Sequence, residues 1–121
     1  MSTIGRNAKL ITNASERGRV RAFYEGILGA THVAPKPDMD LYKFPDGFSL
    51  GVEFVDAAHA LSVDDAKKGA WLEVVVDDVA ATKARLGDLG ITPFDYVDRA
   101  HTYFQAPGGQ VFRLAPRGGT V

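Results

Sequence analysis

The sequence predicts an α+β domain in which one βαβββ module occurs twice within 121 residues. One observation is a repeat, because the turn segment that starts at Pro45 returns at Pro107, a shift of 62 residues. Another is that each half combines short apolar runs with one apolar stripe at helical spacing. A half of about 60 residues has a marginal core when it stands alone. We therefore expect a single domain over 1–121, with a first module at 8–55, a linker at 56–69 and a second module at 70–116.

The first module is expected to begin with a strand and to continue with a helix and three more strands. Ser15 and Glu16 offer a cap and an acidic first turn for the helix. Gly29 is placed to end it. The apolar stripe of this helix consists of Val20, Phe23, Tyr24, Ile27 and Leu28. The expected strands cover residues 9–13, 31–34, 40–44 and 49–55, and a Pro-Asp-Gly turn joins the last two.

The second module repeats this order. Asp77 and Asp78 begin its helix, and Gly90 ends it. Its expected strands cover residues 71–76, 91–97, 101–105 and 110–115. The polar, alanine-rich segment 56–69 is expected to be a solvated linker with at most one helical turn. Residues 117–121 are expected to form a frayed tail.

Alternation along the strands separates an apolar face from a mixed face in each module. The apolar faces should pack under the helices. They contain Leu50, Val52, Phe54, Leu72, Val74, Val76, Phe112 and Leu114. The mixed faces should border a cavity or solvent, and they contain Ser49, Gly51, Glu53, Trp71, Glu73, Val75, Val111, Arg113 and Ala115.

Composition narrows the classes of partner. A net charge of −1 provides no general attraction to nucleic acid or to an anionic membrane. The chain has no cysteine, which excludes disulfides, thiolate metal sites and a cysteine nucleophile. No apolar run approaches the roughly 18 residues of a membrane helix, and residues 1–8 lack the apolar core of a signal peptide. We expect a cytoplasmic protein.

The order of the elements resembles the vicinal oxygen chelate superfamily. The resemblance rests on the two modules, on Phe23, Tyr24, Leu28 and Gly29 in the first helix, and on the Pro-x-Gly turn before the last strand of each module. It covers residues 8–116. The superfamily includes glyoxalase I, bleomycin-resistance proteins, fosfomycin-resistance enzymes and extradiol dioxygenases. The resemblance implies a curved mixed sheet around a cavity, and frequently a homodimer.

In metal-dependent members of this superfamily, ligands from the first and last strands of both modules hold one divalent ion. Counting along the repeat places these positions at Lys9, Gly51, Trp71 and Arg113. Lysine and arginine are cationic at neutral pH, indole nitrogen only donates, and glycine has no side chain. The resemblance therefore implies the pocket of this superfamily without its usual metal, and we expect no cofactor.

Three interpretations of the remaining residues stay open. Lys9 and Arg113 beside Trp71 could form a receptor for a small anionic or aromatic molecule, with Tyr103 and His101 on a strand that lines the pocket. Alternatively, Lys9 pairs with Glu53, Arg113 pairs with Glu73, and Trp71 fills the space. Glu53, Glu73 and His101 are also the only groups that an unusual metal site could use, although the nearby cations disfavour it. Glu73 is a weak candidate for a general base.

Three functions are compatible with the sequence. The preferred one is a metal-free protein of the bleomycin-resistance type that binds a small molecule. A metal-dependent lyase, isomerase or dioxygenase with relocated ligands is the second, and an accessory module with an empty pocket is the third. His32 and His59 are expected to be structural or exposed. A dimeric ferredoxin-like barrel is the alternative fold, but three strands between the helices fit it less well.

Overall fold

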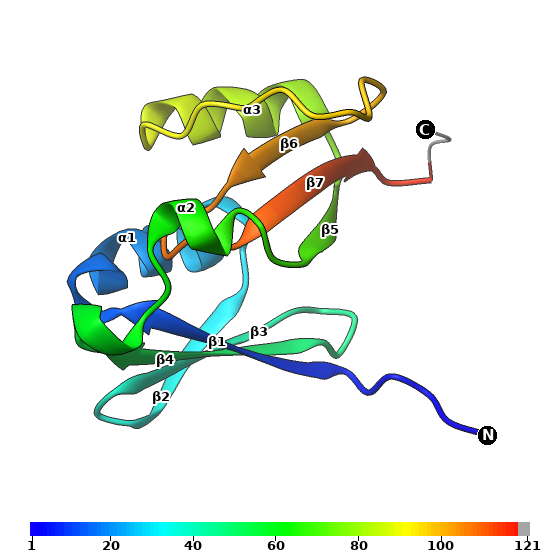
Figure 1. Cartoon of the computed structure of the whole chain (residues 1–121). Coiled ribbons are helices and arrows are strands. Elements are labelled where there is room, and N and C mark those ends of the chain that lie inside the picture. The colour runs from blue at the N-terminus through cyan, green and yellow to red at the C-terminus, as the bar shows by residue number, and fades with distance from the viewer. Residues whose placement is uncertain (119–121) are drawn as a thin grey trace. The chain divides into compact units, whose positions relative to one another are not determined.

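The computed structural model describes residues 1–118, which form two compact units, Met1–Ala60 and a second unit that begins at Leu61. Each unit combines a mixed sheet with helical segments (Figure 1). In the first unit one strand precedes the main helical segment and three follow it, whereas in the second unit one strand precedes α3 and two follow it. The predicted α+β class is therefore confirmed. Of the expected tail at 117–121, residues 119–121 lie outside the described part.

The first unit contains a four-stranded sheet in the order β1-β4-β3-β2 (Figure 1). Its strands are β1 (Asn7–Asn13), β2 (Thr31–Lys36), β3 (Met39–Lys43) and β4 (Ser49–Val55). β1 is parallel to β4, and the other neighbours are antiparallel. β2 extends past its expected end because it lies at the edge of the sheet, where Pro35 is tolerated and the register is irregular.

Three short segments replace the single helix expected in this unit: η1 (Ala14–Glu16), α1 (Arg17–Arg21) and the π-helix η2 (Ala22–Ile27). The capping residue is Asn13 rather than Ser15, because the Asn13 side chain accepts the Ser15 N–H at 3.0 Å. Gly29 ends the helix with a φ of 76°, as predicted. Tyr24 in η2 is buried, and its ring stacks on that of Tyr42 with the ring centres 5.1 Å apart.

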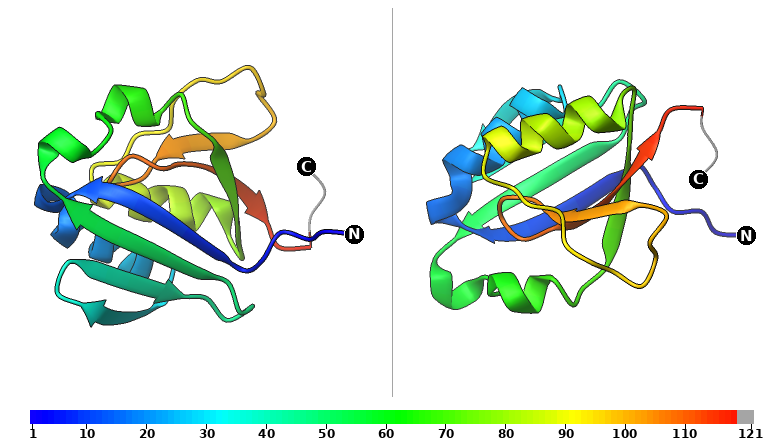
Figure 2. Two further views of the ribbon diagram at one scale, coloured as in Figure 1. Left: turned by 60° about the horizontal axis from the view of Figure 1, so that its bottom comes forward. Right: turned by 90° about the horizontal axis from the view of Figure 1, so that it is seen from above.

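The second unit contains a three-stranded sheet in the order β5-β7-β6 (Figure 2). It is formed by β5 (Trp71–Val76), β6 (Thr102–Gln105) and β7 (Val111–Pro116), and α3 (Val79–Asp88) contacts β7. The Asp78 side chain caps α3, and Gly90 follows with a φ of 79°. The linker holds two short helical segments, η3 (Ala57–His59) and α2 (Val63–Ala66), rather than the single turn expected.

The predicted strand at 91–97 is wrong. Within it, only Phe94 forms a bridge, to Tyr103. The Ile91 N–H is used to close the end of α3, where it donates to the Leu86 carbonyl at 2.9 Å. Pro93 has no N–H to contribute to a ladder. The segment therefore crosses to β6 as a loop, which places Asp98 next to the sheet.

The apolar faces predicted from alternation are largely confirmed. Leu50, Val52, Phe54, Phe112 and Leu114 are buried. Their counterparts on β5 are half-buried. Val111 and Ala115, which were expected on a mixed face, are buried as well. None of the helices in the described part has the length and apolar character needed to cross a lipid bilayer.

Candidate ligand-binding site

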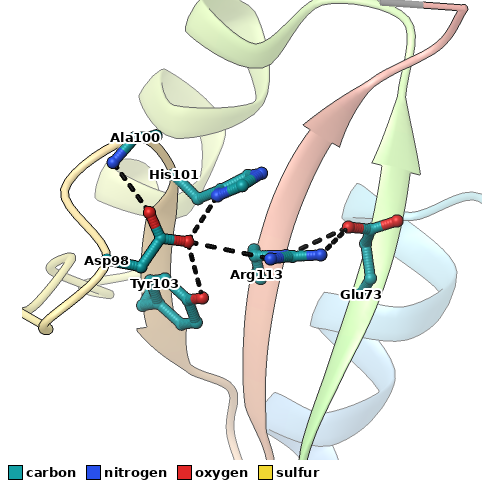
Figure 3. Close-up of polar contacts among 6 residues, drawn as sticks. All are labelled: Glu73, Asp98, Ala100, His101, Tyr103 and Arg113. Carbon is teal, nitrogen blue, oxygen red and sulfur yellow. Dashed lines mark hydrogen bonds and ion pairs between the residues drawn. The ribbon is translucent and has the colours of Figure 1, made fainter. Parts of the chain in front are cut away.

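One row of side chains crosses the sheet of the second unit. Pairing in the ladders places Tyr103 on β6 opposite Arg113 on β7, and Arg113 opposite Glu73 on β5. Residues that face each other across a sheet point to the same side of it. The three side chains therefore meet on the face opposite the buried Phe104 and Phe112 (Figure 3).

Two carboxylates hold the Arg113 guanidinium in place. Glu73 Oε2 accepts hydrogen bonds from Arg113 Nε at 3.0 Å and from Nη2 at 2.6 Å. Nη1 lies 3.7 Å from Asp98 Oδ2 on the other side. The hydrogen bonds to Glu73 raise the pKa of Arg113 above its usual value. The cation is thus fixed in position and its charge is compensated.

Asp98 is the centre of the cluster, although the sequence analysis did not select it. Its Oδ1 accepts the Ala100 N–H at 2.9 Å, and its Oδ2 accepts the Tyr103 hydroxyl at 3.0 Å. His101 Nδ1 lies 2.5 Å from the same Oδ2. The Ala100 bond, followed by those from His101 and Tyr103, lowers the pKa of Asp98. Its position three residues before His101 is the signal that could have identified it.

Aromatic rings border this charged row. The Arg113 guanidinium carbon lies 4.5 Å from the centre of the Trp71 ring, which is a cation–π distance. The Tyr103 ring meets the Trp71 ring edge-on, with the ring centres 6.1 Å apart. The centre of the Tyr96 ring lies 4.6 Å from that of Tyr103. Trp71 remains 40% exposed. A large aromatic surface is therefore available beside a fixed cation.

In the first unit, the predicted residues form a smaller arrangement. Lys9 Nζ lies 3.1 Å from Glu53 Oε1, and both side chains are exposed to solvent. Lys9 pairs in register with Gly51. The space beside Gly51 is filled, because a Cβ added there would meet Met39 Cε at 2.7 Å and Leu41 Cδ2 at 3.3 Å. Both ion pairs considered in the sequence analysis thus form, Lys9 with Glu53 and Arg113 with Glu73.

The two units differ in register by two residues, which corrects the equivalence inferred from the repeat. Lys9 lies opposite Gly51, whereas Trp71 lies opposite Val111 and Glu73 opposite Arg113. In position within its sheet, Glu73 is therefore the counterpart of Lys9. Trp71 lies two residues before Glu73 on β5, so its side chain is on the same face of the sheet.

A second polar cluster in the first unit surrounds Asp40, whose side chain is only 2% exposed. Arg17 Nη2 donates to Asp40 Oδ1 at 2.8 Å, and the Tyr42 hydroxyl donates to Oδ2 at 3.1 Å. His32 Nε2 lies 2.9 Å from Oδ1. Burial, the largest single influence, raises the pKa of Asp40, but the bonds from Arg17, His32 and Tyr42 together lower it.

A cavity of about 750 Å³ adjoins this second cluster, between the helical segment and β2. The charged groups that line it are already paired, Arg17 with Asp40 and Arg21 with Glu25. No site residue predicted from the sequence lines it. We therefore place the candidate site at the Arg113 cluster, where an aromatic surface and a polar row meet.

The two glutamates considered for an unusual metal site are both engaged by cationic side chains. Glu53 is engaged by Lys9, and Glu73 accepts two N–H groups from Arg113. Within residues 1–118, no group of three or more His, Asp or Glu side chains is arranged to hold a metal. A cation bound at Glu73 would also face the guanidinium at short range, which is repulsive.

Comparison with known proteins supports the fold. A model for the glyoxalase-like domain matches residues 9–115. The fosfomycin resistance protein FosX from Listeria monocytogenes, an E126Q mutant complexed with Mn(II) and 1S,2S-dihydroxypropylphosphonic acid, has a TM-score of 0.73 and 16% identity, covering 100% of this chain and 94% of its own. A possible glyoxalase from Bacillus cereus has a TM-score of 0.68 and 17% identity, covering 93% and 98%.

A glyoxalase/dioxygenase from Nostoc punctiforme has a TM-score of 0.66 and 16% identity, covering 96% of this chain and 97% of its own. No curated protein matches the sequence. The structural similarity establishes a common fold, but at identities this low it carries no information about substrate.

Proposed function

Because the chain belongs to the glyoxalase-like domain family, we propose that it is a metal-free protein that binds a small aromatic molecule on the Arg113 face of its second unit. The observation that supports this most directly is the position of Trp71. The residue is 40% exposed, and the centre of its ring lies 4.5 Å from the Arg113 guanidinium carbon. Large aromatic side chains left exposed beside a fixed polar group are typical of recognition surfaces.

The charge of the cluster limits the ligand. Arg113 is compensated by Glu73 and Asp98, so this face does not present a free cation. A ligand carboxylate would have to replace Glu73 as the partner of Arg113. The aromatic part of the ligand should therefore provide most of the affinity, and a single anionic group should add selectivity.

The preference for a metal-free site has its own test. Its support is the engagement of Glu53 by Lys9 and of Glu73 by Arg113. Elemental analysis of purified protein, before and after reconstitution with Mn, Fe, Co, Ni and Zn, should find less than one equivalent of any metal. A stoichiometric metal that is lost on Glu73→Gln would favour the metal-dependent enzyme instead. We also propose a homodimer, which sedimentation equilibrium would test.

Fluorescence offers a sharp test of ligand binding because Trp71 is the only tryptophan in the chain. We expect 1-naphthoate and 1-naphthalenemethanol to change Trp71 emission saturably, and octanoate to have no effect. Arg113→Ala should weaken the binding of 1-naphthoate more than the binding of 1-naphthalenemethanol. Arg117→Ala is a matched control, because Arg117 pairs with Asp77 at 2.7 Å on the exposed surface of the same unit.

One result would contradict the proposed site. Calorimetry could detect binding of an aromatic compound that leaves Trp71 emission unchanged. If that compound also binds Arg113→Ala as tightly as the natural sequence, it must occupy another surface. Failure of all aromatic compounds to bind by either method would contradict the proposed function itself.

A further inference from the structure

The cavity in the first unit is lined by one face of the helical segment and by residues of β2 and β3. Its volume of about 750 Å³ is within the usual range for pockets that hold small molecules. The lining residues with small side chains are Gly18, Ala22 and Gly26 on the helical segment and Ala34 on β2. Short side chains on both walls leave room for a ligand between them.

The fold itself does not require glycine at positions 18 and 26. A Cβ added at either position would meet no atom within 4 Å, and neither residue has a φ in the left-handed region. Glycine is less favourable than alanine within a helix. It is also the usual residue where a ligand approaches the backbone closely. The two missing side chains thus cost helix stability and keep this wall of the cavity open.

The helical segment is irregular where it borders the cavity. Three lining residues, Ala22, Glu25 and Gly26, belong to the π-helix η2. π-helical turns are rare, and they occur frequently at functional sites. The irregular turn therefore coincides with the open wall.

One ion pair on this wall has unused hydrogen-bonding capacity. Arg21 Nε donates to Glu25 Oε1 at 3.0 Å, and the two side chains are 53% and 42% exposed. Within residues 1–118, this is the contact that joins the two side chains, and the Nη groups of Arg21 and Oε2 of Glu25 have no other partner. The pair therefore presents two donor groups and one acceptor to a ligand.

The second ion pair beside the cavity is fully engaged. Arg17 Nη1 donates to the Pro37 carbonyl at 2.5 Å, and Nη2 donates to Asp40 Oδ1 at 2.8 Å. The Arg17 guanidinium carbon also lies 4.8 Å from the centre of the Phe54 ring. Arg17 and Asp40 therefore shape the cavity, and Arg21 with Glu25 is the pair that can bind a ligand.

The charges of the lining side chains indicate the charge of the ligand. The cavity is lined by two arginines and two carboxylates, so with His32 neutral these charges sum to zero. A ligand anion on Arg21 would lie close to Glu25, and a ligand cation on Glu25 would lie close to Arg21. A ligand that carries one charge of each sign satisfies both groups without this repulsion.

We propose that this cavity binds a small zwitterion of the α-amino acid class. The ligand carboxylate accepts hydrogen bonds from the two Nη groups of Arg21, in the bidentate geometry that a guanidinium and a carboxylate favour. The ligand ammonium donates to Glu25 Oε2, and the ligand side chain lies against Gly18 and Ala22. No residue of the Arg113 face lines this cavity, so binding here goes beyond the proposed function and is independent of it.

Assigned heteronuclear NMR spectra of the full-length protein can detect this binding at individual residues. We expect leucine and methionine to shift the backbone amides of Gly18 and Gly26 saturably. The amide of Gly87 is a matched control and should not move. Gly87 is also a helical glycine at which a Cβ would meet no atom within 4 Å, but it lies on α3 and does not line the cavity.

Two relatives of leucine test the need for both charges. 4-Methylpentanoate lacks the ammonium group, and 3-methylbutylamine lacks the carboxylate. Each should bind at least about tenfold more weakly than leucine, because one charge-assisted hydrogen-bonded contact is lost. Equal binding of leucine and 4-methylpentanoate would overturn the assignment to a zwitterion.

Variants of the helical segment test the position of the ligand. Arg21→Gln should weaken leucine binding about tenfold. Arg19→Gln is its control and should leave binding unchanged, because Arg19 is 50% exposed, pairs with Glu16 and does not line the cavity. Gly18→Leu should block the cavity, whereas Gly87→Leu should not alter binding.

Three results would contradict the proposal. One is the failure of both leucine and methionine to shift the Gly18 and Gly26 amides. Another is unchanged affinity for leucine in Arg21→Gln and in Gly18→Leu, which would place the ligand elsewhere. The third is loss of leucine binding in Arg113→Ala, which would assign the amino acid to the aromatic face. Binding of 1-naphthoate, followed by Trp71 emission, reports on the proposed function separately, so failure at either site is recognised on its own.

Discussion

Each unit holds one aspartate surrounded by an arginine, a histidine and a tyrosine, but the two aspartates have different surroundings. Asp40 lies on the helix side of its sheet, and its side chain is 2% exposed. Tyr42, which donates to it, also stacks on the buried Tyr24. Asp98 lies in the loop before β6, and its side chain is 31% exposed.

The orientation of the histidines differs as well. His32 directs Nε2 toward Asp40, so its outer nitrogen faces the carboxylate at 2.9 Å. His101 instead places Nδ1 2.5 Å from Asp98 Oδ2, and Nε2 is buried in both histidines. The same four residue types thus form a buried cluster around Asp40 and a more exposed cluster around Asp98. Burial, rather than composition, separates the two clusters.

Removal of the buried aspartate should have the largest effect on stability. Asp40→Ala leaves Arg17, His32 and Tyr42 without their acceptor, and we expect the free energy of unfolding to fall by about 3 kcal/mol. Urea unfolding followed by circular dichroism measures it. Asp98→Ala should lower stability much less. Equal losses at the two positions would remove the distinction between the clusters.

The acid dependence of stability should follow the same distinction. The pKa of Asp40 is lowered in the folded state, because the bonds from Arg17, His32 and Tyr42 outweigh the opposing effect of burial. The stabilisation is therefore complete above the unfolded pKa of 3.8 and is lost as the pH falls through the folded value. Between about pH 5 and pH 2, the free energy of unfolding should therefore change less with pH for Asp40→Asn than for the natural sequence.

Asp98→Asn should change that pH profile less, although the pKa of Asp98 is lowered too. Asp98 is 31% exposed, so solvent screens its interactions more than those of Asp40. A larger change for Asp98→Asn than for Asp40→Asn would show that exposure is a poor guide to the contribution of these clusters.

The tyrosines sharpen the comparison with a smaller change. Tyr42→Phe removes the hydroxyl that donates to Asp40 at 3.1 Å but keeps the ring stacked on Tyr24. We expect about 1 kcal/mol of destabilisation in urea unfolding. Tyr103→Phe should have little effect on unfolding but should alter Trp71 fluorescence titrations. The reverse pattern would exchange the roles of the two clusters.

An exposed ion pair provides the lower limit of the series. Lys9 and Glu53 have side chains that are 52% and 34% exposed. Lys9→Ala should change the free energy of unfolding by less than about 0.5 kcal/mol. Thermal and urea unfolding of the variant measure this. A loss comparable to that of Asp40→Ala would mean that burial does not explain the strength of the Asp40 cluster.

Much of the fold could be predicted from local pattern. Alternation identified the buried faces of β4 and β7, and glycines at positions 29 and 90 marked the ends of both helices. These features depend on near neighbours in the chain. The prediction of a strand at 91–97 was wrong, although its apolar residues suggested one. Pro93 has no N–H, and the Ile91 N–H is used at the end of α3, so neither residue can donate to a strand ladder.

The candidate site was only partly predictable. Arg113 was selected by counting along the repeat to the ligand positions of the superfamily, and Glu73 and Tyr103 were selected from the faces of their strands. The ladder brings the three into one row. Asp98 was missed because it reaches this row from a loop, and no periodic pattern describes a loop. Asp40 was treated as an ordinary strand residue, since its partners Arg17 and His32 lie on other elements.

The register difference between the units has a consequence for the duplication itself. Lys9 and Gly51 are 42 residues apart, whereas Glu73 and Arg113 are 40 apart. A slip by an even number of residues keeps every side chain on its original side of the sheet, so the apolar pattern tolerates it. Duplicated sheets can therefore drift in steps of two without loss of their cores, and each step brings new residues to the centre of an old site. An exchange of β5 for β1 guided by the repeat would place Trp71, not Glu73, opposite Gly51.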